Sequence, residues 1–167
     1  MDHQTNPQPS QRHTTAALAA TDVEGLRASG IPEEAWPLLP HGNVGSLVPK
    51  LGIHFDEFTV DRVSATMPVQ GNTQVVGLLH GGATAALAET LGSFAAAIHA
   101  GGRALPVGVD LNITHHRGAR DGLVTGVATP LHLGRTTATH AIEVTDETGR
   151  RIATARITNQ LLPVQAS

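Results

Sequence analysis

The chain has 167 residues, a net charge of −3 and 40% hydrophobic residues, the composition of one ordinary globular domain. The weak negative charge provides no basic surface for nucleic acid, and an aromatic content of 2% leaves few rings for base stacking. Because there is no cysteine, disulfides, thiolate catalysis and cysteine-ligated zinc are excluded. We find no signal peptide and no apolar run of membrane-spanning length, so we expect a cytoplasmic protein that binds neither nucleic acid nor membrane.

The first fifty residues differ in pattern from the rest of the chain. Residues 1–20 are rich in Gln, Thr, Pro and Ala without a hydrophobic period, which predicts a flexible leader. Asp22 can cap a short helix that ends at Gly30, and residues 32–39 predict a second helix that begins with proline. Residues 42–52 are rich in turn formers and predict a linker. The chain is therefore expected to consist of a leader (1–20), an N-terminal helical extension (21–50) and a main domain (51–163).

The main domain predicts strands around one long helix. Alternation of apolar and polar residues predicts strands over 51–58 and 61–69. Residues 76–100 open with an apolar run, pass through two glycines and then predict a helix of about five turns that ends at Gly101. Four β-rich runs follow, over 105–117, 122–132, 135–145 and 151–162. This order predicts an α+β fold, in which an antiparallel sheet curls around a single covering helix.

Glu89 lies in the middle of the long helix, where Ala and Leu leave no wide polar face. A helix that is apolar all round is normally buried, and a buried unpaired carboxylate costs several kcal/mol. The neighbours of Glu89 on its own face are small, which predicts open space beside the acid: Ala85, Ala86, Gly92 and Ser93. Glu89 can act as a general base toward water or as a nucleophile on an acyl carbon, and Ser93 can hold the attacking water.

The start of the same helix offers hydrogen-bond donors. Gly81 and Gly82 place backbone N–H groups at a helix N-terminus, where the macrodipole favours the negative charge of a developing oxyanion. The alternative is that both glycines only make a sharp turn. His80 can cap the helix, orient a substrate or transfer protons, and Gln74 lies in the loop that leads to the same place.

The spacing between these two groups constrains the assembly. Glu89 lies eight residues after Gly81, which is roughly 12 Å along a helix axis. A nucleophile and an oxyanion donor must both lie about 3 Å from the reacting group. Two antiparallel helices related by a two-fold axis can bring Glu89 of one chain beside Gly81 of the other. We therefore predict a homodimer with its active sites at the interface.

A second glycine motif lies at a turn between two predicted strands. Gly134, Arg135 and Thr136 offer backbone N–H groups, a hydroxyl and a guanidinium, which suit a phosphate, and Arg117 can add charge from another turn. The alternative is a tight turn with solvated arginines. His115 and His116 are adjacent in a predicted strand and point to opposite faces, so no metal site is expected there.

Taken together, these residues resemble the hotdog-fold acyl-CoA thioesterases of the PaaI type, including the Arthrobacter-type 4-hydroxybenzoyl-CoA thioesterases. The resemblance runs from about Gly52 to Leu162 and depends mainly on the His80-Gly81-Gly82 run and the acid that follows it in the helix. It implies a six-stranded antiparallel sheet around the helix, and dimers that often pair into tetramers. It departs from many relatives at Gly118, where they carry proline.

The resemblance also implies roles for individual residues. Glu89 would be the catalytic acid and the Gly81 amide would polarise the thioester carbonyl. Gln74 would assist at that carbonyl, with His80 as the histidine at the helix start. Ser93 would place the water. Contacts to the substrate and its CoA phosphates would come from Gly82, Arg117, Gly134, Arg135 and Thr136. No cofactor is implied, because CoA is part of the substrate.

These observations predict hydrolysis of an acyl-CoA thioester, with an aryl or aryl-alkyl acyl group as the first expectation. One alternative is a non-catalytic acyl-CoA binder or sensor on the same fold, which has no need of Glu89. Another is a hotdog dehydratase or hydratase, whose histidine and acid motifs we do not find. The sequence leaves general-base and covalent roles of Glu89 both open.

Overall fold

The computed structural model describes residues 21–39 and 41–164 of the chain. Along the chain, the helices and strands are α1 (Val23–Ala28), the 3-10 helix η1 (Glu33–Leu38), α2 (Leu47–Leu51), β1 (His54–Phe58), β2 (Val63–Pro68), α3 (Gly81–Ala100), β3 (Ala104–His115), β4 (Leu123–Leu133), β5 (Thr137–Asp146) and β6 (Arg151–Pro163).

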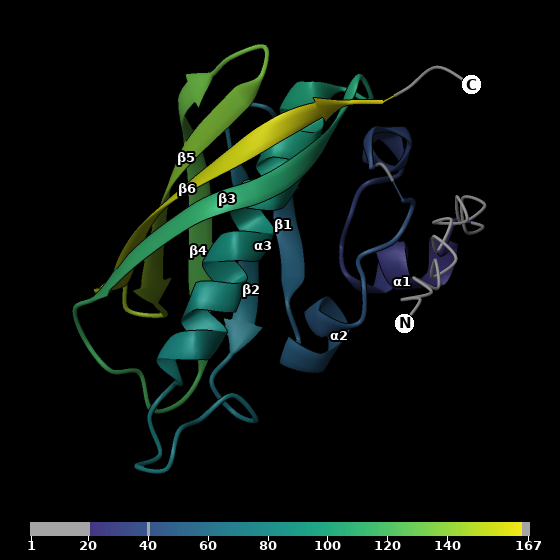
Figure 1. The fold of residues 1–167 in the computed structure, drawn as a ribbon. Coiled ribbons are helices and arrows are strands. Elements are labelled where there is room, and N and C mark those ends of the chain that lie inside the picture. Colours follow the sequence, from purple (N-terminus) through teal and green to yellow (C-terminus); the bar gives the residue numbers. More distant parts are fainter. Residues whose placement is uncertain (1–20, 40, 165–167) are drawn as a thin grey trace, which may run out of the picture.

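The strands form a single antiparallel sheet in the order β1-β2-β4-β5-β6-β3, and the sheet curves around α3 (Figure 1). The helix packs against β2 to β6, and through Phe94 it also meets the rings of Phe55 and Phe58 of β1. This arrangement confirms the predicted hotdog fold, a long helix wrapped by a six-stranded sheet. Because the order runs from β1 to β3, β3 is an edge strand with one side free of pairing in the described residues.

Both ends of α3 have clear local causes. The ring of His80 caps the N-terminus, and Gly101 ends the helix in the left-handed conformation with φ of 57°. Gly92 explains how closely the helix approaches β6, because a Cβ atom there would collide with the Cγ2 atom of Ile157. We expected Gly92 to leave open space beside Glu89, and this was wrong. The space beside Gly92 is occupied by the side chain of Ile157 from β6.

The N-terminal segment packs onto the core of the main domain. Leu26, Ile31 and Ala35 are buried in the same apolar cluster as the residues of α3 and the sheet. The backbone N–H of Phe55 in β1 donates to the carbonyl of Ser29, at 2.8 Å. The indole N–H of Trp36 donates to the carbonyl of Ile31, which fixes the turn between α1 and η1.

The predicted linker over 42–52 needs a correction, because its second half forms the short helix α2 (Leu47–Leu51). The helix lasts only five residues and contains Pro49, which is tolerated in a first turn because the N–H groups there have no helical acceptor. It ends at Gly52, whose φ is 67°. Prolines and glycines crowd this short segment, which is why its composition resembles that of a linker.

Candidate functional site

Glu89 is the only acidic residue of α3, and its side chain is half-buried on the helix. Burial raises the pKa of the Glu89 carboxyl, because the charged form loses water, while a hydrogen bond from Ser93 lowers it in part. The Ser93 hydroxyl donates to Oε1 of Glu89 at 3.5 Å, across one helical turn. The carboxyl group is therefore held in a partly dry place beside a hydroxyl, as a general base or nucleophile requires.

The space for this carboxyl group comes from the sheet. Gly108 of β3 faces Glu89, and a Cβ atom on Gly108 would lie 2.5 Å from Oε1 of the acid. A β-bulge follows directly, between Gly108 and Asp110. The glycine thus leaves a notch in the sheet, and the acid occupies it.

The donors at the start of α3 are fewer than the sequence suggests. The backbone N–H of Gly82 donates to Nδ1 of His80 at 2.8 Å, so the Gly82 amide is already engaged. The Gly82 amide, offered by the sequence as an oxyanion donor, therefore serves the helix cap, while the predicted contact of Gly82 with substrate stays a prediction. The N–H of Gly81 has no acceptor within the described residues. Among the two glycines, Gly81 is therefore the one that can donate to an oxyanion.

A cavity of about 350 Å³ lies beside the start of α3 and brings together three predicted site residues, Gln74, Gly81 and Arg117. The ring of His115 also lines it, with Nε2 3.0 Å from the position of a Cβ atom on Gly81. We considered His115 only as a metal ligand and missed this position. The alternation of β3 places His115 on the side facing the helix.

A second cavity, of about 260 Å³, lies beside Ser93 and between α3 and the N-terminal segment. Phe94, Leu105 and Pro106 provide apolar walls. Residues of the N-terminal segment close the other side: Leu39, His41, Asn43, Val44 and Gly45. Phe94 is held by the rings of Phe55 and Phe58, with centroids 4.9 and 5.8 Å away. Because cavities of about 150 Å³ can take up benzene, this one has room for a substituted ring.

The predicted phosphate motif lies at the other end of α3. Gly134, Arg135 and Thr136 line a cavity of about 630 Å³ together with Arg103. The carbonyl of Gly134 is hydrogen-bonded to Nε2 of His99 at 2.8 Å, which ties the turn to the last turn of the helix. Two arginines at one cavity give it a positive charge that suits phosphate.

The predicted site residues therefore lie in three places within one chain: the start of α3, its middle and its end. Glu89 and Gly81 belong to different places on the same helix, as their spacing predicts. The described residues contain no group of three His, Asp or Glu side chains arranged to hold a metal ion. No helix among residues 21–39 and 41–164 is long and apolar enough to cross a membrane.

Two buried polar side chains were missed by the sequence analysis. Asn159 of β6 is fully buried, and its Nδ2 donates to Oγ of Ser93 at 3.3 Å. His140 of β5 is also fully buried, and neither ring nitrogen has a partner in the described residues. Both stand at inward-facing strand positions, where the alternating pattern predicts apolar residues. A polar side chain at such a position is the signal that could have revealed them.

Comparison with known proteins places these features in a family. A family model described as Thioesterase superfamily matches residues 76–153. The proofreading thioesterase EntH of Cronobacter sakazakii is 46% identical over 121 residues, covering 72% of this chain and 88% of that protein. The 1,4-dihydroxy-2-naphthoyl-CoA hydrolase of Escherichia coli is 44% identical, covering 71% and 88%. A mutant thioesterase from Pseudomonas aeruginosa has a similar crystal structure, with 39% identity, a TM-score of 0.69, and 72% and 88% coverage.

Proposed function

Because the chain belongs to the thioesterase superfamily and is a thioester hydrolase, we propose that it cleaves acyl-CoA thioesters whose acyl group carries an aromatic ring. The half-buried Glu89 carboxyl group, bonded to Ser93, which itself lines an apolar cavity, is the observation that carries this proposal. The related E. coli hydrolase is named for a naphthoyl-CoA substrate, which supports an aromatic acyl group. The products are the free carboxylic acid and CoA.

The proposed site belongs to the PaaI and Arthrobacter-type branch, within a main domain of residues 51–163 and with 21–50 as an N-terminal helical extension. Residues 1–20, expected as a leader, lie outside the described residues. CoA enters as part of the substrate, so the reaction needs no resident cofactor. We place the enzyme in the cytoplasm, where acyl-CoA esters are consumed.

In the proposed reaction, ionised Glu89 acts on the thioester carbon, either directly or through a water molecule that it deprotonates and Ser93 holds. The carbonyl oxygen gains negative charge and is stabilised by the Gly81 amide, with Gln74 beside it. Collapse of the intermediate breaks the carbon–sulfur bond, and the CoA thiolate leaves and takes up a proton. In the direct route, water then hydrolyses the acyl anhydride on Glu89.

The proposed site is shared between two subunits, as the distance along α3 requires. Glu89 of one protomer and Gly81 of its partner would face the same carbonyl, and a two-fold axis creates two such sites. Edge strand β3 supports pairing, because it is twelve residues long and exposes Val107 and Val109. Long apolar edges that remain uncovered are prone to pair with another chain. The resemblance extends the proposal to a dimer of dimers.

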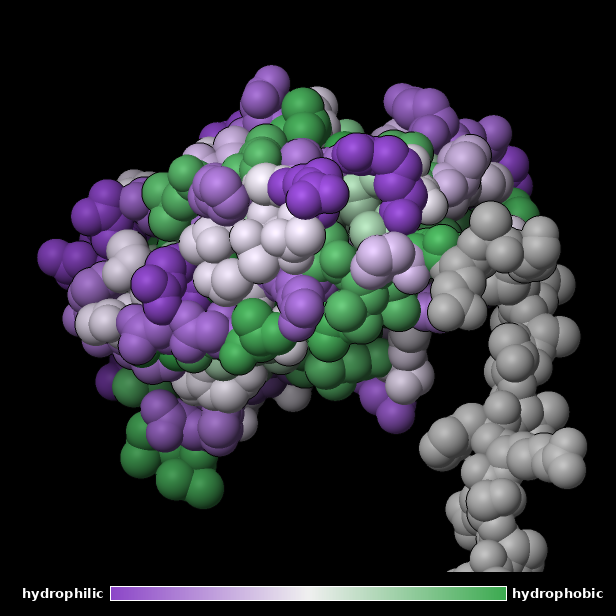
Figure 2. Space-filling view, turned by 45° about the horizontal axis from the view of Figure 1, so that its top comes forward, coloured by the Kyte–Doolittle hydropathy of each residue, from purple (hydrophilic) through white to green (hydrophobic). Residues whose placement is uncertain are grey.

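The surface is consistent with an uncovered contact region. Figure 2 shows apolar residues gathered in the lower middle of one face, below a margin of strongly hydrophilic ones. The thiol end of CoA would approach the cavity with Gln74 and Arg117, and its phosphates would meet the basic cavity with Arg135. His80 supports the site by capping the helix that presents Gly81.

A thiol-release screen tests the proposed activity. We expect release of free CoA from aromatic esters, weaker release from aliphatic ones, and loss of release in Glu89→Gln with substrate binding retained. Activity falls as the pH drops through the raised pKa of Glu89, because the carboxylate must be ionised. Full activity of Glu89→Gln would overturn the proposed role of the acid.

Mixing two inactive variants tests the shared site. Gly81→Pro removes the proposed donor and keeps the backbone, because proline suits the first helical position and His80 already has the extended conformation (φ −71°, ψ 130°) that precedes proline. Its Cβ atom lies 3.0 Å from Nε2 of His115, so that ring must move by a few tenths of an ångström. Each variant alone is expected to be inactive. Random mixing of Glu89→Gln with Gly81→Pro makes half the dimers hybrid, each with one intact site, so about a quarter of wild-type activity should return. No recovery after subunit exchange would refute the shared site.

A further inference from the structure

Asn159 occupies a position in β6 that the strand pattern reserves for apolar side chains. The other residues of β6 on the side facing α3 are buried and apolar: Ala153, Ala155, Ile157 and Leu161. Asn159 is buried to the same extent, with 0% exposure. Its Oδ1 atom has no hydrogen-bond partner within the described residues. Burying an unsatisfied amide oxygen costs about 1–3 kcal/mol, so packing alone does not account for this residue.

The other end of the Asn159 amide leads directly to the acid. Its Nδ2 group donates to Oγ of Ser93 at 3.3 Å, and Ser93 Oγ in turn donates to Oε1 of Glu89 at 3.5 Å. Small residues on both neighbouring strands flank Asn159, since it pairs with Gly108 of β3 and Ala138 of β5. The amide therefore reaches the helix without obstruction.

The direction of these bonds carries a chemical consequence. A serine hydroxyl has one hydrogen and two lone pairs, whereas an amide NH₂ group can only donate. When Asn159 donates to Ser93, the serine oxygen is used as an acceptor and its single hydrogen stays directed at Glu89. Without Asn159, the hydroxyl can rotate and accept from water instead.

We propose that Asn159 is a positioning residue, which holds the Ser93 hydroxyl as a hydrogen-bond donor to the Glu89 carboxylate. This inference rests on the proposed role of Glu89 in thioester hydrolysis. Asn159 touches neither substrate nor the reacting atoms, so its effect on the reaction passes through Ser93. Loss of the Ser93 bond raises the pKa of Glu89 further, because that bond favours the ionised form.

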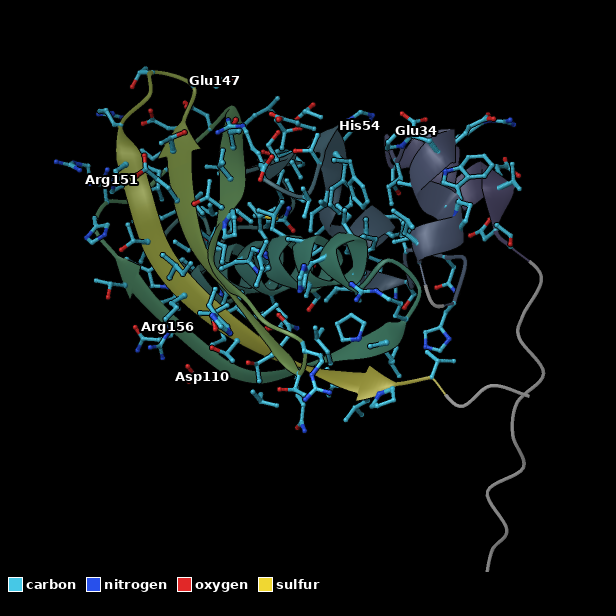
Figure 3. The ribbon with its side chains drawn as sticks, turned by 90° about the horizontal axis from the view of Figure 1, so that it is seen from above. Glu34, His54, Asp110, Glu147, Arg151 and Arg156 are labelled. Carbon is cyan, nitrogen blue, oxygen red and sulfur yellow. The ribbon has the colours of Figure 1, made fainter. Side chains whose placement is uncertain are left out.

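Other ionisable side chains near α3 have no hydrogen bond to Ser93 or Glu89 within the described residues. His41 of the N-terminal segment lines the cavity beside Ser93. From the sheet, His115 faces the start of the helix, and His140 interacts with His99 near its end. Asp110 and Arg156 pair with each other on the outer side of β3 and β6, as Figure 3 shows. Because protonation of His140 lowers the stability of the fold as the pH drops below 6.5, the acid limb is compared only at pH values where each variant remains folded, and there a shift of the limb reports on Glu89.

The test is Asn159→Leu, which keeps the volume and removes the donor. We expect kcat to fall about tenfold, equivalent to about 1.4 kcal/mol or one hydrogen bond, and the acid limb to move to higher pH. The unfolding free energy should be equal or higher, because an unsatisfied oxygen is removed. If the leucine variant does not fold, Asn159→Ala removes the same bond and is expected to give the same kinetic result.

Two comparisons keep the inference open to refutation. Thr158→Val is the matched control: it removes a hydrogen bond to Thr139 on the outer side of the same strand, and should leave kcat and the pH profile unchanged. In a Ser93→Ala background, Asn159→Leu should have no further effect on kcat. An unchanged acid limb in Asn159→Leu, or an equal loss with and without Ser93, would overturn the positioning role. Full activity of Glu89→Gln would instead overturn the proposed function itself.

Discussion

A substitution at Gly108 can displace the Glu89 side chain while Glu89 itself is left unmutated. A Cβ atom at this position would lie 2.5 Å from Oε1 of Glu89 and 3.4 Å from its Cδ atom. Ordinary van der Waals contact begins near 3.4 Å, so Gly108→Ala forces the carboxylate oxygen to withdraw by about 0.9 Å. The backbone of Gly108 lies outside the left-handed region, so alanine fits there without strain.

The predicted consequence is a loss of rate without a loss of stability. A misplacement of about 1 Å can cost about 10²-fold in rate, so kcat should fall by about that factor. The displaced atom is the end of a flexible, half-exposed side chain, so the free energy of unfolding should change by no more than about 1 kcal/mol. Alanine also reduces the freedom of the unfolded chain, which offsets part of any cost.

The assay combines thiol release under saturating substrate with thermal unfolding of the same samples. In a Glu89→Gln background, Gly108→Ala should cost little further activity, because the group it displaces is already inactive. Glu89→Asp shortens the side chain, so the loss caused by Gly108→Ala should be smaller in that background. Wild-type kcat in Gly108→Ala, or an equal loss in the Glu89→Gln background, would show that the notch in β3 does not position the acid.

Three further predictions concern stability. Burial, and to a smaller extent the charge of His99, lower the pKa of His140 from 6.5 to about 4. The free energy of unfolding should therefore fall by about 3 kcal/mol as the pH drops from 6.5 to 4, and urea unfolding of His140→Leu should lack this pH dependence. His80→Ala should cost about 1 kcal/mol by loss of the helix cap, and His80→Asn should restore it. Gly92→Ala should destabilise the folded protein by about 1–3 kcal/mol, because the added methyl group collides with Ile157. Adding Ile157→Ala should remove this collision, so calorimetry of the double variant should show a smaller effect of Gly92→Ala.

The fold was predictable because its strongest signals are local. The alternation over 61–69 appears as β2, and the apolar run with its terminal glycines appears as α3. Asp22 caps α1 through its carboxylate, which accepts from the N–H of Gly25, as its position before the helix indicates. Each of these depends on residues within one or two turns of one another. The short helix α2 was missed because a five-residue helix provides too few positions for a period to appear.

The surroundings of the acid were less predictable, because they depend on strand register. The acid itself stands out in the sequence as a charge in an apolar helix. Gly108 faces the acid and Asn159 faces Ser93 only because β3 and β6 pair in one register, and a bulge between Gly108 and Asp110 shifts that register. A one-residue slip would turn both to the outer side. The sequence indicated that His80 can cap the helix, and it does; that its ring engages the Gly82 amide depends on the rotamer of His80, which the sequence does not give.

The convergence on Glu89 explains why an alanine-rich helix suits this site. Ser93 reaches the acid along the helix, Asn159 of β6 reaches Ser93, and Gly108 of β3 faces the acid. Such contacts need the sheet close to the helix, and Gly92 allows that approach by leaving room for Ile157. Each chain thus positions its own acid through its own helix and sheet. Because the Gly81 amide lies eight residues earlier on the same helix, the proposed active site combines the acid of one chain with the amide of a second chain.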